Sequence, residues 1–85
     1  MAESAMLTAV KNALGITGDT MNSTLQGYID IVCAFMANAG VSAARIAASP
    51  SVVARGVNET WNNDGTANFS AMFLNMVSQL ALMGD

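Results

Sequence analysis

Few side chains of this 85-residue chain could perform chemistry, and their surroundings argue against most of it. Cys33 could act as a nucleophile, but it lies in an apolar stretch and the chain has no histidine to activate it. A buried thiol is inert, so we interpret Cys33 as a core residue. A single cysteine also excludes a disulfide or a paired-cysteine metal site. The chain has no phosphate-binding loop, and Asp30 lies inside an expected helix without a second carboxylate to pair with. We therefore predict that the protein is not an enzyme.

Two short segments resemble parts of ligand-binding motifs without completing either. Asn62, Asp64 and Gly65 match a fragment of a calcium loop, but Ala71 stands where an EF-hand needs a glutamate. We interpret this segment as a solvated loop, with contact to a partner as the alternative, and expect neither a metal nor a cofactor. The stretch Gly15-Ile-Thr-Gly18 has the spacing of a KH-domain loop but lacks flanking strands and basic residues. A helix end followed by a turn explains it.

The segment Ala39-Gly-Val-Ser42 could form the corner of a helix-turn-helix DNA-binding motif. Against this, Met36 stands where that motif wants a small residue, and Pro50 stops the would-be recognition helix. That helix offers only Ser42 and Arg45 to bases or phosphates. We favour an ordinary helix corner, and keep a small DNA-binding regulator that uses this corner, up to Ile46, as the alternative function.

The large apolar side chains fit a core or a contact with another subunit. Trp61 needs a partner for its indole N–H, and we expect it to pack in the core against the last helix, with a subunit boundary as the alternative. Methionine repacks easily and suits both core gaps and adaptable binding surfaces. We assign Met36 to the core, and Met76 fits either place. The remaining five of the seven methionines fit core and interface equally well.

The composition describes a weakly charged chain of one domain. Hydrophobic residues make up 53% of it and charged residues 11%, against about 25% charged in ordinary domains. Three cations and a net charge of −3 cannot supply the phosphate contacts of tight nucleic-acid binding. The surface is therefore suited to being covered by neighbouring proteins.

We expect neither a membrane span nor an export signal. The longest uncharged apolar run covers residues 31–37, far short of the roughly 18 residues that cross a bilayer. The first residues, Met1-Ala-Glu-Ser4, have no basic region ahead of a hydrophobic stretch.

Capping residues, glycines and one proline divide the chain into short helices. We predict an all-α fold in a single domain, residues 1–85, as a small bundle of four to five short helices around one long central helix. The expected helices span residues 4–14, 20–39, 42–48, 50–62 and 69–82. The starts and stops come from local signals: Ser4, Gly15, Asp19 or Asn22, Gly40, Ser42, Pro50, and Asn68 or Ser70.

Apolar spacing indicates which helix faces are buried. In the long helix one stripe has helical spacing: Leu25, Ile29, Val32 and Met36. In the fourth helix Val53, Val57 and Trp61 follow at i, i+4 and i+8, with Arg55 and Glu59 four residues apart on another face.

Taken in order, several segments resemble the small head–tail connector proteins (adaptor or head-completion proteins) of tailed bacteriophages. The resemblance runs from about residue 6 to residue 81. The matching segments are Val10-Lys-Asn-Ala-Leu-Gly-Ile16 leading to Asp19, Thr24-Leu-Gln-Gly-Tyr-Ile-Asp30, Ala39-Gly-Val41, Ser51-Val-Val-Ala-Arg-Gly-Val57 up to Trp61-Asn62, and Asn68-Phe-Ser70.

The resemblance implies a structural virion protein of the phage neck, assembled in the cytoplasm of a bacterial host. Such proteins form a ring, usually of twelve copies, beneath the portal protein. The ring extends the DNA channel and provides the platform for the stopper or the tail, and DNA passes through it without specific binding. An acidic, cation-poor chain suits such a channel. We expect subunit or portal contacts at the last helix and the loop before it: Trp61, Asn62, Asp64, Phe69, Phe73 and Met76.

Overall fold

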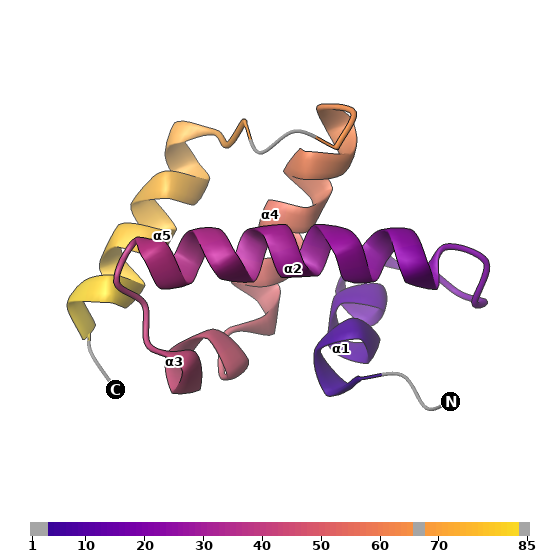
Figure 1. Ribbon diagram of the computed structural model, residues 1–85, viewed down its shortest axis with the longest axis horizontal. Helices are drawn as coiled ribbons and strands as arrows, with labels where there is room; N and C mark the ends of the chain where they lie inside the picture. The colour runs from indigo at the N-terminus through magenta and orange to yellow at the C-terminus, as the bar shows by residue number, and fades with distance from the viewer. Residues whose placement is uncertain (1–3, 66–67, 84–85) are drawn as a thin grey trace.

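In the computed structural model, residues 4–65 and 68–83 are described, and these residues form five α-helices and no strand (Figure 1). The all-α prediction is therefore confirmed. Each helix begins and ends within two residues of its expected position. The helices are α1 (Ala5–Leu14), α2 (Asn22–Asn38), α3 (Ala43–Ala47), α4 (Pro50–Asn62) and α5 (Ala71–Met83).

The helix ends follow local chemistry. Ser4 and Ser42 cap α1 and α3, since each hydroxyl accepts a hydrogen bond from the backbone N–H three residues later. Gly15 ends α1 in the left-handed conformation, with φ of 72°, and Gly40 follows α2 with φ of 99°. Pro50 is the first residue of α4, where its missing N–H has no helical partner to lose.

The start of α2 differs from the expectation that Asp19 or Asn22 caps it. Its N-cap is Met21, which makes no side-chain capping bond. The two expected caps serve Lys11 of α1 instead. The Lys11 Nζ donates to Asn22 Oδ1 at 2.8 Å, to the Gly18 carbonyl at 2.6 Å and to Asp19 Oδ1 at 3.4 Å. Lys11, only 6% exposed, therefore fastens the turn between α1 and α2.

The core is built from the predicted stripe of α2 and the inward faces of its neighbours. Leu25, Ile29, Val32 and Met36 are all buried, as expected. The buried residues from the other elements are Leu7, Val10, Val41, Ile46, Val53, Ala54, Val57, Phe73 and Val77.

A single long central helix is not confirmed. The longest helix is α2, with 17 residues. However, the shorter helix α4, which has 13 residues, also packs against all four others, so α2 is not the single centre of the bundle. Gly56 allows this, because its missing side chain lets α4 lie directly against Val32 of α2 and Phe73 of α5.

Within the described residues, no helix combines the length and the apolar character that crossing a bilayer requires.

Candidate interaction site at the α4–α5 junction

The six residues expected to contact a partner lie on both sides of the α4–α5 junction. Trp61 and Asn62 belong to the last turn of α4, Asp64 and Phe69 lie between the helices, and Phe73 and Met76 belong to α5. Three of them are divided between two pockets. Asn62 and Phe69 line the same pocket, whereas Trp61 lines another.

Phe73 corrects one of these expectations, because it lies in the core and not at the surface. It is 0% exposed. Its ring centroid lies 4.6 Å from that of Phe69 and 6.2 Å from that of Phe35. In the folded chain Phe73 therefore has no surface with which to touch a partner, and its role is to hold α5 to the other helices.

Trp61 is more exposed than a core residue. The sequence favours a core position for Trp61, with a subunit boundary as a compatible alternative. Its side chain is 40% exposed, while its neighbour Thr60 is fully buried, so the core position is wrong and the subunit boundary stays a prediction. The reason is helix geometry: seven residues after Val53 the helix has returned to within about 20° of the same direction, whereas eight residues after it the angle is about 80°. Trp61 thus leaves the inward face, and its ring meets the ring of Tyr28 edge-on, with centroids 5.8 Å apart.

Phe69 and Met76 are half-buried, and Asn62 and Asp64 are exposed. The Phe69 ring packs against Phe35 at a centroid distance of 4.8 Å, so Phe35, Phe69 and Phe73 form an aromatic cluster between α2 and α5. Asp64 has a φ of 55°, in the left-handed region that Asn and Asp tolerate better than other side chains. The fragment that resembles a calcium loop is thus a tight turn at the end of α4.

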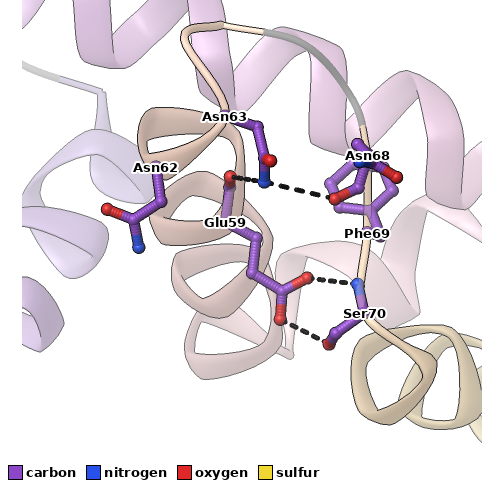
Figure 2. A pocket seen from close by; sticks show the side chains of 6 residues that line it. All are labelled: Glu59, Asn62, Asn63, Asn68, Phe69 and Ser70. Atoms are coloured by element: carbon purple, nitrogen blue, oxygen red, sulfur yellow. Dashed lines mark hydrogen bonds between the residues drawn. The ribbon is translucent and has the colours of Figure 1, made fainter.

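A polar pocket of about 380 Å³ lies at this junction, and its lining side chains are drawn in Figure 2. Its walls come from the last two turns of α4 and from the segment that leads into α5. The lining residues are Glu59, Asn62, Asn63, Asn68, Phe69 and Ser70.

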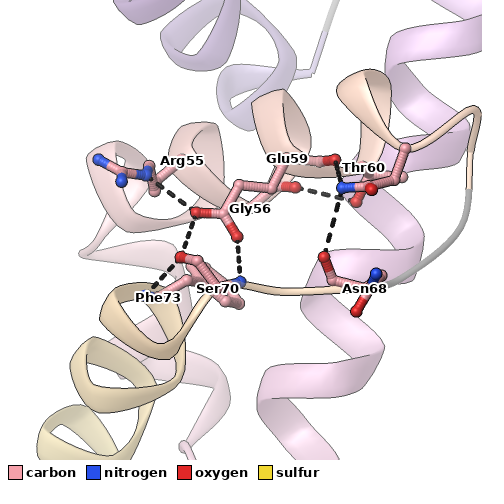
Figure 3. A network of polar contacts seen from close by, with 8 residues as sticks. Arg55, Gly56, Glu59, Thr60, Asn68, Ser70 and Phe73 are labelled. Atoms are coloured by element: carbon pink, nitrogen blue, oxygen red, sulfur yellow. Dashed lines mark hydrogen bonds and ion pairs between the residues drawn. The ribbon is translucent and has the colours of Figure 1, made fainter.

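Glu59 is the centre of the polar contacts at this junction (Figure 3). Its Oε1 accepts a hydrogen bond from the Ser70 backbone N–H at 2.7 Å, and its Oε2 accepts from the Ser70 hydroxyl at 2.7 Å and from Arg55 Nε at 3.0 Å. Burial alone would raise the pKa of Glu59. The bonds from Ser70 and the positive charge of Arg55 outweigh burial and lower that pKa.

The Asn63 side chain makes a second set of hydrogen bonds across the junction, between the end of α4 and the segment before α5. The side-chain amide of Asn63 donates to the backbone carbonyl of Glu59 at 2.7 Å and to that of Asn68 at 3.3 Å. Ser70 also caps α5, since its hydroxyl accepts from the Phe73 N–H at 3.2 Å. The sequence indicated the Arg55–Glu59 pair by its spacing and Ser70 as a possible cap. It gave no signal for the bonds between Glu59 and Ser70, which lie eleven residues apart.

The outward side of α5 is uncharged and mixed in polarity, because Asn75, Ser78 and Gln79 are exposed there together with large apolar side chains. No charged residue occurs in Ala71–Met83, and four large apolar side chains of this helix are well exposed. They are Met72 at 58%, Leu74 at 42%, Leu82 at 88% and Met83 at 59%. We call these four residues the α5 outer face. They form two pairs, one in the first turn of α5 and one in its last turn. Exposed large apolar side chains that gather on a small domain are typical of an interaction surface.

A shallow apolar groove lies between α1, α2 and α3. It is lined by Ser4, Met6, Gln26, Ile29, Asp30, Cys33, Ala34, Ala37, Ala43, Ile46 and Ala47. Cys33 is half-buried there, and burial, followed by the nearby Asp30 carboxylate, raises the pKa of its thiol. A raised pKa leaves little thiolate at neutral pH, which is unfavourable for a nucleophile.

The helix corner that could read DNA is short. After the turn at Gly40, α3 has five residues, and Arg45 is half-buried. Among the described residues, no group of three or more acidic, histidine or cysteine side chains could hold a metal ion. No family model, no curated protein and no solved structure matches this chain.

Proposed function

We propose that this chain is a structural protein of the phage neck, a small head–tail connector that forms a ring beneath the portal. In this proposal the ring, of about twelve copies as the resemblance implies, extends the DNA channel and receives the stopper or the tail. The protein performs no catalysis. DNA passes through the ring without being bound specifically.

The observation that carries the proposal is the α5 outer face. A helix with no charged residue buries Phe73 and Val77 inward and still exposes Met72, Leu74, Leu82 and Met83. Copies of one chain that meet through two different surfaces assemble into rings when the rotation between them closes. We assign the α5 outer face to the contact with the neighbouring copy. Trp61, Asn62, Asp64, Phe69 and Met76 remain candidates for subunit or portal contact.

Quantitative mass spectrometry of density-purified phage particles, comparing this chain with the portal protein, tests the proposal. A connector ring gives roughly equal copy numbers of the two proteins. Absence of the chain from particles, combined with abundance in infected cells, rules out the connector function. Salt-sensitive binding to duplex DNA that Arg45→Ala abolishes would then support the alternative, a DNA-binding regulator.

A pair of charge-adding variants tests the assigned surface. Leu82→Glu places a charge on the α5 outer face, and Thr24→Glu places the same charge at an exposed position of α2. We expect particles complemented with Leu82→Glu to lose the chain, because burying an unpaired carboxylate opposes the contact. Particles with Thr24→Glu should contain it at the normal level. Equal incorporation of both variants would show that the contact lies elsewhere.

A further inference from the structure

We propose that Glu59 is an acid-released clamp that holds Ser70, and with it the first turn of α5, against α4. The clamp belongs to the folded chain itself. Its consequence for assembly, control over how the α5 outer face is presented, rests on the proposed function.

The geometry of the clamp is a continuous series of bonds from α4 into α5 (Figure 3). Arg55 donates to Glu59, Glu59 accepts both the N–H and the hydroxyl of Ser70, and the Ser70 hydroxyl accepts from the Phe73 N–H. The Glu59 side chain is only 12% exposed, although Ser70 itself is exposed. Bonds of this kind to an ionised group are stronger than those between neutral groups.

The clamp needs the negative charge of Glu59. An ionised carboxylate accepts through both oxygens, whereas the protonated acid turns one oxygen into a donor. Protonation therefore ends the attraction to Arg55 and leaves the three donors around Glu59 short of an acceptor. The lowered pKa of Glu59 has the same origin, since Ser70 and Arg55 stabilise the charged form against the effect of burial.

The other ionisable side chains near α4 do not take the place of Glu59 as the acceptor for Ser70. The carboxylate bonds to Arg55 and Ser70, and α5 contributes no ionisable residue. Asp64, in the turn after α4, is exposed. The ionisable side chains on the other helices packed against α4 are Lys11 on α1, Tyr28, Asp30 and Cys33 on α2, and Arg45 on α3.

Release of the clamp is expected to be local. Phe69, next to Ser70, is held by stacking on Phe35 and Phe73, and the rest of α5 is held by the burial of Phe73 and Val77. Acid should therefore loosen Ser70 and the exposed residues beside it, Asn68, Ala71 and Met72, before the core unfolds.

A pH titration of the isolated full-length chain by NMR tests the clamp. We expect the Ser70 amide proton and the Glu59 carboxyl carbon to move with one shared midpoint, below the ordinary glutamate value of 4.5. Over the same range the amides of Val10 and Val32, in the core of α1 and α2, should stay unchanged. A Ser70 amide that moves only when the whole spectrum unfolds would overturn the proposal.

Two variants sharpen the result. In Glu59→Gln the Ser70 amide should already lie at its acid position at neutral pH and should no longer titrate. The matched control, Asp64→Asn, removes an exposed acid near the same junction and should leave the Ser70 titration intact. A Ser70 titration that persists in Glu59→Gln would overturn the assignment, and if that variant does not fold, the titration of the unmodified chain still decides.

The NMR titration and the particle analysis can fail independently, so failure of the clamp is distinguishable from failure of the connector function. A shared midpoint in a chain that is absent from phage particles would keep the clamp and discard the connector. A chain that occurs in particles but whose Ser70 amide does not titrate would keep the connector and discard the clamp.

Discussion

Gly56 of α4 and Phe73 of α5 lie so close together that a Cβ atom added at Gly56 would stand 2.8 Å from Cζ of Phe73. The same Cβ would stand 2.8 Å from Cγ1 of Val32 in α2. Because Val32 and Phe73 are both fully buried, neither side chain has free space into which it could move. The absence of a side chain at Gly56 is therefore what lets three helices meet.

Gly56→Ala should lower the free energy of unfolding by about 1–2 kcal/mol. Overpacking costs about 1–3 kcal/mol, and the better helix propensity of alanine offsets up to about 1 kcal/mol of that. Gly27→Ala is the control, because a Cβ at Gly27 meets nothing within 4 Å; it should raise stability by about 0.5–1 kcal/mol. Urea unfolding of both variants measures the difference, and a stabilising Gly56→Ala would contradict the packing described here.

Lys11→Met should destabilise the chain by about 1.5–3 kcal/mol, the range for losing hydrogen bonds that involve a charged group. Methionine retains an apolar stem but removes the Nζ that reaches Gly18 and Asn22. Asp19→Asn removes the ion pair alone, at a side chain that is 84% exposed, and should change stability by less than about 1 kcal/mol. Urea midpoints decide, and equal effects of the two variants would assign the contribution of Lys11 to the ion pair.

Phe73→Leu and Trp61→Ala should act on different properties. Phe73 is fully buried, so its shortening should reduce stability by about 1–2 kcal/mol even in a chain that meets no partner. Trp61→Ala, at a side chain 40% exposed, removes much less buried area relative to its size. We expect it to affect incorporation into particles more than unfolding of the isolated chain. If Trp61→Ala mainly reduced stability and Phe73→Leu mainly reduced incorporation, Trp61 would be the core residue and Phe73 the contact residue.

Cys33 should react slowly with a disulfide reagent such as Ellman's reagent at neutral pH. Burial and then Asp30 raise the pKa of its thiol above the ordinary value of 9.0, and the thiolate is the reacting form. The rate should rise with pH through the raised pKa. Asp30→Asn removes the second cause, so it should lower the pKa and speed the reaction below that pKa. A rate equal to that of a free thiol in the folded chain would contradict this environment.

The helices were predictable because their signals are local. A serine cap, a left-handed glycine or a proline at the first helical position acts within one turn of backbone, as Ser42, Gly40 and Pro50 do here. The buried stripe of α2 and the pair of Arg55 with Glu59 follow likewise from the helical repeat.

The contacts that build the candidate site depend on how the helices cross. Nothing in the spacing of Glu59 and Ser70 indicates that they bond, because the chain reverses direction between them. The expected caps Asp19 and Asn22 instead bind Lys11, since a buried ammonium requires acceptors more than the α2 N-terminus requires a cap.

The sequence by itself determined the approximate bounds of five short helices, an apolar stripe along the longest of them and a chain poor in charge. Only the tertiary structure decided that α4 packs against every other helix, that Phe73 lies inside and Trp61 partly outside, and that Glu59 holds the start of α5. The physical reason is the distance along the chain over which each kind of interaction acts. Capping and helical periodicity act over three or four residues, whereas burial and long-range hydrogen bonds depend on which surfaces meet once the whole chain has packed.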